Sequence, residues 1–125
     1  MYTLQSLNLF AINPYLPSIN FHDGQVWLSE QVQDDIESFC GHCPESGNPR
    51  EVLEFIHEQC TLLKKPTFNE HVAQMSLAGF CVLKAIKHAI EVRMFGIERA
   101  GDFRDDLLPV QFQCVETNLS SFSLH

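Results

Sequence analysis

Apolar residues in the middle of the chain recur every three or four positions, a spacing that predicts three helices. The first spans 29–40, with Ser29 as its cap and Gly41 as its stop. The second begins at Asn48-Pro49 and runs to about residue 65. The third opens with the capping box Thr67–Glu70 and continues to about Ile97.

This third helical pattern is long for a domain of this size. Thirty residues of helix span about 45 Å, whereas a compact domain of 125 residues has a diameter of about 36 Å. The helix therefore crosses the whole domain or bends, and Gly79 and Gly96 are its weak points. We expect it to be the buried central element, because its polar residues fall in one narrow arc: Lys84, Lys87, His88, Glu91 and Glu98. Arg93 lies opposite that arc, so it either pairs with the acids of 102–106 or lies where the helix has loosened.

Shorter alternating segments predict strands at 1–12 and 108–114, with a weak strand or a tail at 120–124. Asp23-Gly24 between two short apolar runs is typical of a β-hairpin. The predicted fold class is α+β: a small antiparallel or mixed sheet from the chain ends and the early hairpin, packed with three helices of which the third is central. With 125 residues the chain is predicted to form one globular domain, 1–125.

The net charge of −8 belongs entirely to the first half of the chain. Residues 1–63 hold nine acids and one base, Arg50, whereas residues 64–125 hold seven of each. Nucleic-acid binding needs clustered Lys and Arg, so it is disfavoured. The apolar stretch 72–97 is interrupted by charged residues, so no membrane span is expected.

The acids of the first two helices lie opposite their apolar positions and would form two acidic ridges if these helices pack side by side. A solvated face is one interpretation of such ridges, but solvated helices usually interleave both signs of charge, and this half of the chain has a single base. We therefore expect the ridges to dock a basic protein partner, as in immunity proteins, antitoxins or inhibitors. The candidate partner-binding residues are Glu30, Asp34, Glu37, Glu51, Glu54 and Glu58.

The tetrad Cys40-Gly41-His42-Cys43 resembles the active motif of protein disulfide isomerases, a family with the thioredoxin fold. That resemblance would imply a reactive cysteine pair at a helix N-terminus, where the helix dipole lowers the thiol pKa. Here the tetrad is predicted at a helix C-terminus. Residues 21–29 with Asn48-Pro49-Arg50 resemble the amino-terminal domain of phage antirepressors, which would imply regulation linked to nucleic acid.

The alternative function is a metal- or thiol-dependent enzyme or regulator that uses Cys40, Cys43, His57 and Cys60, a set of donors that zinc accepts. If the first two helices form an antiparallel hairpin, Cys60 lies about 16 Å along the helix from the loop end. We therefore expect no cofactor. Five cysteines without a disulfide framework, and no signal segment, favour the cytoplasm. No motif identifies an enzyme.

Overall fold

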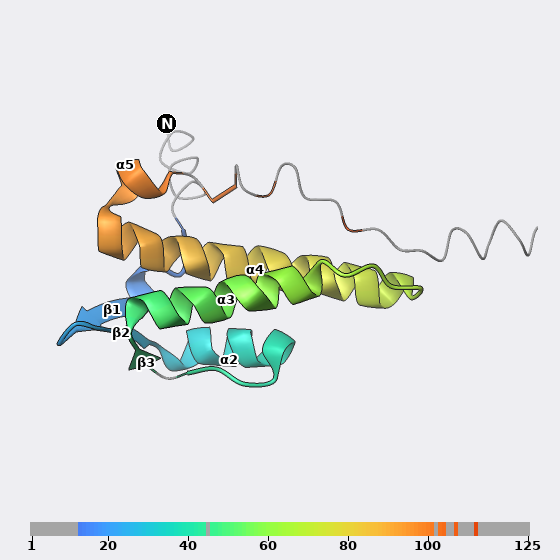
Figure 1. Ribbon diagram of the computed structural model, residues 1–125, viewed down its shortest axis with the longest axis horizontal. Helices are drawn as coiled ribbons and strands as arrows, with labels where there is room; N and C mark the ends of the chain where they lie inside the picture. Colours follow the sequence, from blue (N-terminus) through green and yellow to red (C-terminus); the bar gives the residue numbers. More distant parts are fainter. Residues whose placement is uncertain (1–12, 45, 102, 105–106, 108–111, 113–125) are drawn as a thin grey trace, which may run out of the picture.

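The computed structural model describes residues 13–44, 46–101, 103–104, 107 and 112. The predicted strands 1–12 and 120–124 lie outside these residues, as does the strand 108–114 apart from Phe112. The described chain is α+β, with three long helices stacked against one end of a small antiparallel sheet (Figure 1). The predicted fold class is confirmed.

The sheet begins with the predicted hairpin. A short 3₁₀ turn, Leu16–Ser18, leads into β1 (Ile19–His22), which pairs with β2 (Gln25–Leu28). Asp23 and Gly24 join the strands with positive φ angles of 53° and 75°. These angles suit the tight two-residue turns that Asp-Gly favours, because Asp tolerates and Gly readily adopts this backbone region.

The first two helices begin at the residues that the sequence indicates. Ser29 Oγ accepts a hydrogen bond from the Val32 amide at 3.3 Å, and α2 (Glu30–Cys40) follows it. Gly41, with a φ of 83°, ends this helix. Asn48 Oδ1 accepts from the Arg50 amide at 2.9 Å at the start of α3 (Pro49–Leu63).

The chain between α2 and α3 corrects one expectation. Instead of turning into an antiparallel helix hairpin, it returns along the length of α2 and adds β3 (Ser46–Gly47) to the free edge of β2. Both helices therefore start beside the sheet and run parallel (Figure 1). Helix α2 is about 16 Å long, and the residues from Gly41 to Gly47 can span that distance when extended.

The long helix α4 (Glu70–Phe95) crosses the domain without a break at Gly79. It begins two to three residues later than predicted, because Asn69, and not Thr67, caps it by accepting from the Val72 amide at 3.2 Å. Gly96, with a φ of 89°, ends it, and the short helix α5 (Ile97–Ala100) follows.

Helix α4 packs against α2, α3 and β1, and its buried residues, apart from Ala73, all lie between Gly79 and Ile90. The core contains residues from every layer: Ile19, Val26, Leu28, Val32, Ile36, Val52, Ile56, Cys60, Phe80, Leu83, Ile86, Ala89 and Ile90. Val72, Met75 and Leu77, in the first turns of α4, are exposed. The helix is therefore central to the fold along only part of its length.

Two polar residues of α4 differ in burial from what the helical periodicity of the sequence predicts. His88, expected on the exposed arc, is buried. Arg93, which lies opposite that arc, is exposed and donates from Nε and Nη2 to the Leu16 carbonyl oxygen, at 3.2 and 2.8 Å, rather than packing in the core. The acids Asp102, Asp105 and Asp106 lie outside the described residues. Helix α4 contacts elements on several of its sides, so it has no single exposed arc. Periodicity alone therefore cannot predict which of its polar residues are exposed.

Candidate functional site

The six acids that the sequence singles out are all exposed. Three lie on α2 and three on α3, on the sides of the helices that face away from the core. Within the described part of the chain, no lysine, arginine or histidine forms an ion pair with any of them. Among the described residues, these carboxylates therefore lack a direct ionic partner.

The structure does not bring the two rows together as neighbouring ridges. Because α2 and α3 each pack mainly on α4, the rows border different hollows. Glu30 and Asp34 line a shallow hollow of about 420 Å³ with Asp35, whose carboxylate accepts from the Tyr15 hydroxyl at 2.8 Å. Glu51 borders another hollow, beside His42 and Phe55.

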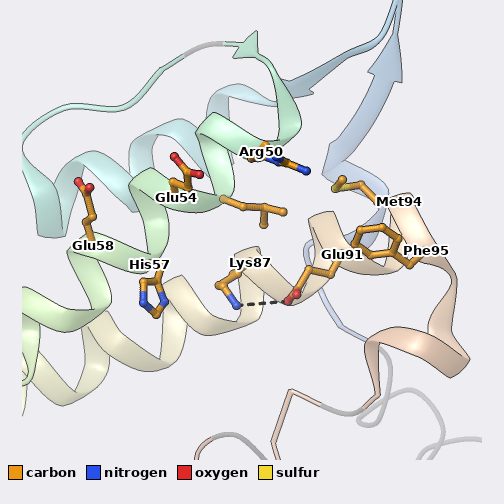
Figure 2. Close-up of a pocket in the computed structure, with 9 residues that line it drawn as sticks. Arg50, Glu54, His57, Glu58, Lys87, Glu91, Met94 and Phe95 are labelled. Atoms are coloured by element: carbon orange, nitrogen blue, oxygen red, sulfur yellow. Dashed lines mark ion pairs between the residues drawn. The ribbon is translucent and has the colours of Figure 1, made fainter.

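Glu54 and Glu58, by contrast, lie on the rim of a groove of about 430 Å³ between α3 and α4 (Figure 2). Figure 2 shows both carboxylates on the outer side of α3, pointing away from α4, while His57 points toward α4. The groove has an apolar part near the C-terminal end of α4, formed by Leu53, Met94 and Phe95. Half of the Phe95 side chain, 51%, is exposed.

The remaining charges of the groove are partly balanced among themselves. Lys87 Nζ lies 3.5 Å from Glu91 Oε1, one helical turn along α4, and both side chains are partly buried. Arg50 lies at the sheet end of the groove (Figure 2). The pair on α4 cancels and Arg50 offsets one of the two rim carboxylates, so the charged side chains that line the groove carry a net charge of −1.

The cysteines of the alternative site are closer together than the sequence predicts. The expected separation of Cys60 from Cys40 depends on an antiparallel hairpin, whereas the parallel helices place both residues toward the same end of the bundle. Cys40 is near enough to influence both Cys43 and Cys60 electrostatically. His57, however, points into the α3–α4 groove.

The environment of these thiols disfavours the thiolate, which is the form that acts as a nucleophile. Burial, assisted by the nearby Glu37 carboxylate, raises the pKa of Cys43 to about 11. Burial also raises the pKa of Cys60 to about 11, although three lysines nearby act in the opposite direction. Among the residues that the structure describes, no three His, Cys, Asp or Glu side chains are arranged to hold a metal ion.

The tetrad that resembles the disulfide isomerase motif lies at the C-terminal end of a helix, as the sequence predicts. Cys40 is the last residue of α2 and Gly41 its left-handed cap, so the tetrad lies at the negative end of the helix dipole. Burial raises the pKa of Cys40, which is opposite to the shift that this motif needs.

The apolar part of the groove was not predicted from the sequence. Met94 and Phe95 continue the apolar pattern of α4, so they resemble core positions. The sequence carries no signal that distinguishes these two residues from the buried positions of the same helix.

No family model matches the chain, and no curated protein or solved structure is significantly similar to it. The resemblances to disulfide isomerases and antirepressors thus gain no support from comparison. None of the helices in the described residues has the length and apolarity needed to cross a membrane.

Proposed function

We propose that this chain is a small acidic binding protein that docks a basic protein partner, in the manner of an immunity protein, antitoxin or inhibitor. The observation that carries the proposal is the exposure of six carboxylates on α2 and α3, none of which is paired within the described part of the chain. Unpaired carboxylates on α2 and α3 produce a negative electrostatic field around this part of the molecule, and such a field steers a cationic partner.

The α3 carboxylates are the stronger contact candidates. Glu54 and Glu58 are on the rim of a groove that has an apolar part, whereas Glu30 and Asp34 border a shallow hollow lined by polar side chains alone. Stable interfaces combine a desolvated apolar centre with a polar rim, and the α3–α4 groove provides both.

The cytoplasm is our proposed location, because the four cysteines in the described residues are free thiols. The alternative, a metal- or thiol-dependent enzyme, has less support. The pKa values of Cys43 and Cys60, about 11, leave these thiols protonated at neutral pH.

The proposal is tested on the association rate of the chain with a partner captured from the host and then purified. We expect the captured partner to be basic and its association to slow as salt rises, because exposed charges act mainly on the on-rate. The double variant Glu54→Gln/Glu58→Gln should slow association about 3-fold or more at low salt.

The matched control removes the same charge elsewhere, with Asp23→Asn and Glu70→Gln, both at exposed sites. We expect this variant to associate at nearly the wild-type rate. Rates that do not depend on salt, or that are equal in all three proteins, would overturn the acidic contact. They would instead favour contact through exposed apolar side chains near the end of α3 and the start of α4: Leu62, Phe68, Val72 and Met75.

A further inference from the structure

The groove between α3 and α4 combines two features that select for a particular kind of contact. Leu53, Met94 and Phe95 offer apolar surface at one end, and Glu54 and Glu58 offer negative charge along the α3 side. Both features are accessible from the same face of the molecule (Figure 2).

We propose that this groove receives one apolar side chain of Leu or Phe size from a basic segment, whose neighbouring Lys or Arg lies over Glu54 and Glu58. This inference rests on the proposed function and specifies the chemistry of the partner. The apolar side chain would contact Leu53, Met94 and Phe95, and the cation would cross the outer side of α3. The groove volume of about 430 Å³ falls within the range of pockets that hold small ligands.

Three observations favour this occupant. Phe95 is half exposed, so covering it removes apolar surface from water. Met94 is unbranched and flexible, which allows the apolar surface to adapt to different side chains. Lys87 already pairs with Glu91 on the α4 side, so it repels an incoming cation little, and Arg50, the other cation of the lining, lies at the sheet end of the groove.

A second copy of this chain is a poor occupant. Each copy carries a net charge of −8, so two copies repel one another electrostatically. The charge of the groove therefore favours a different, basic protein.

The test uses three small probes that share one apolar part: 4-phenylbutylammonium, 4-phenylbutanol and 4-phenylbutyrate. The full chain is labelled with ¹³C at its methionine methyl groups and titrated with each probe by NMR. Met94 reports on the groove, and Met75, in a separate hollow near the start of α4, is the control within the same molecule. We expect the Met94 signal to shift most strongly with the ammonium probe and least with the carboxylate, while Met75 changes little.

Variants separate the apolar contribution from the charge contribution. Glu54→Gln/Glu58→Gln should remove the preference for ammonium over alcohol and leave alcohol binding at Met94 intact. Phe95→Ser should weaken all three probes at Met94, whereas Phe68→Ser, at a residue that is 63% exposed at the far end of the bundle, should not.

Equal responses of Met94 and Met75, or equal affinity for ammonium and carboxylate, would overturn this inference. So would concentration-dependent dimerisation, measured by sedimentation, that shifts the Met94 signal. In each of these cases the proposed function is still judged separately, by the salt dependence of association with the partner and by its response to Glu54→Gln/Glu58→Gln.

Discussion

The side-chain amide of Asn13 donates a hydrogen bond to Nδ1 of His88, 75 residues later in the chain, at 3.2 Å. Nε2 of the same ring lies 2.5 Å from the Gly101 carbonyl oxygen, which can only accept, so Nε2 carries the proton and Nδ1 is the acceptor. Asn13 also donates to the Ala85 carbonyl and accepts from the Tyr15 amide. This buried network joins the chain before β1 to α4 and to the residue after α5.

Replacing Asn13 with Ala should lower the free energy of unfolding by about 1–3 kcal/mol. The change leaves His88 Nδ1 buried without its donor and removes two further hydrogen bonds. Urea denaturation measures the loss. Asn20→Ala, at an exposed position of β1, is the control and should cost far less. Equal small costs would contradict a structural role for the network.

Gly79→Ala should destabilise the protein, although alanine is the better helix former by about 1 kcal/mol. A Cβ atom at this position would lie 2.7 Å from Cδ1 and 2.9 Å from Cγ of the Phe39 ring, where α2 meets α4. We expect a net loss of about 1–3 kcal/mol in urea denaturation.

The same substitution in a Phe39→Leu background should cost less, since the smaller side chain leaves room for the new methyl group. If Gly79→Ala raises the free energy of unfolding instead, this would contradict the close contact between the Phe39 ring of α2 and Gly79 of α4.

Truncation within α4 should separate its buried central part from its exposed first turns. Leu83→Ala and Ile86→Ala each remove a side chain with no exposed surface and should cost about 2–5 kcal/mol. Leu77→Ala, at a residue that is 43% exposed, should cost much less. Thermal or urea unfolding of the three variants provides the comparison. Costs below about 1 kcal/mol at both buried positions would contradict the core assignment.

Stability should fall at alkaline pH through Tyr15. Burial, followed by the hydrogen bond to Asp35, raises the pKa of Tyr15 from 10.0 to about 12. The folded chain therefore holds the phenol proton more tightly than the unfolded chain does. The resulting stabilisation is fully present below about pH 10 and is lost as the pH rises from 10 to 12.

Unfolding measured between pH 9 and 11.5 checks this prediction against Tyr15→Phe, which has no proton to lose. The difference in stability between wild type and Tyr15→Phe should shrink as the pH rises. A constant difference would show that the raised pKa has no effect on folding.

The described thiols should react slowly at pH 8. Burial raises the pKa of Cys43 and of Cys60 to about 11, so little thiolate is present. Iodoacetamide labelling, mapped by mass spectrometry of peptides, should modify both residues more slowly in the folded chain than in urea. We also expect purified protein to contain no tightly bound zinc. Rapid labelling of Cys43, or one equivalent of zinc, would revive the thiol or metal alternative.

Local signals in the sequence determined most of the secondary structure. Caps and turns act on backbone groups within a few residues, so the sequence predicts them correctly. The helix ends at Ser29, Gly41 and Asn48 and the hairpin turn at Asp23-Gly24 are examples. The α+β class and the six exposed acids followed from periodicity, because the positions opposite an apolar stripe face water.

Tertiary structure decided how these elements meet. The sequence does not show that the chain after Gly41 returns to pair with β2, since two residues of β3 carry no strand pattern of their own. Because the chain returns in this way, α2 and α3 run parallel, and Cys60 lies closer to Cys40 than an antiparallel hairpin would allow. The two acidic rows border different hollows. The return also leaves Leu53, Met94 and Phe95 facing a groove. Contacts between distant segments depend on the path of the whole chain, whereas caps and turns depend on their neighbours alone.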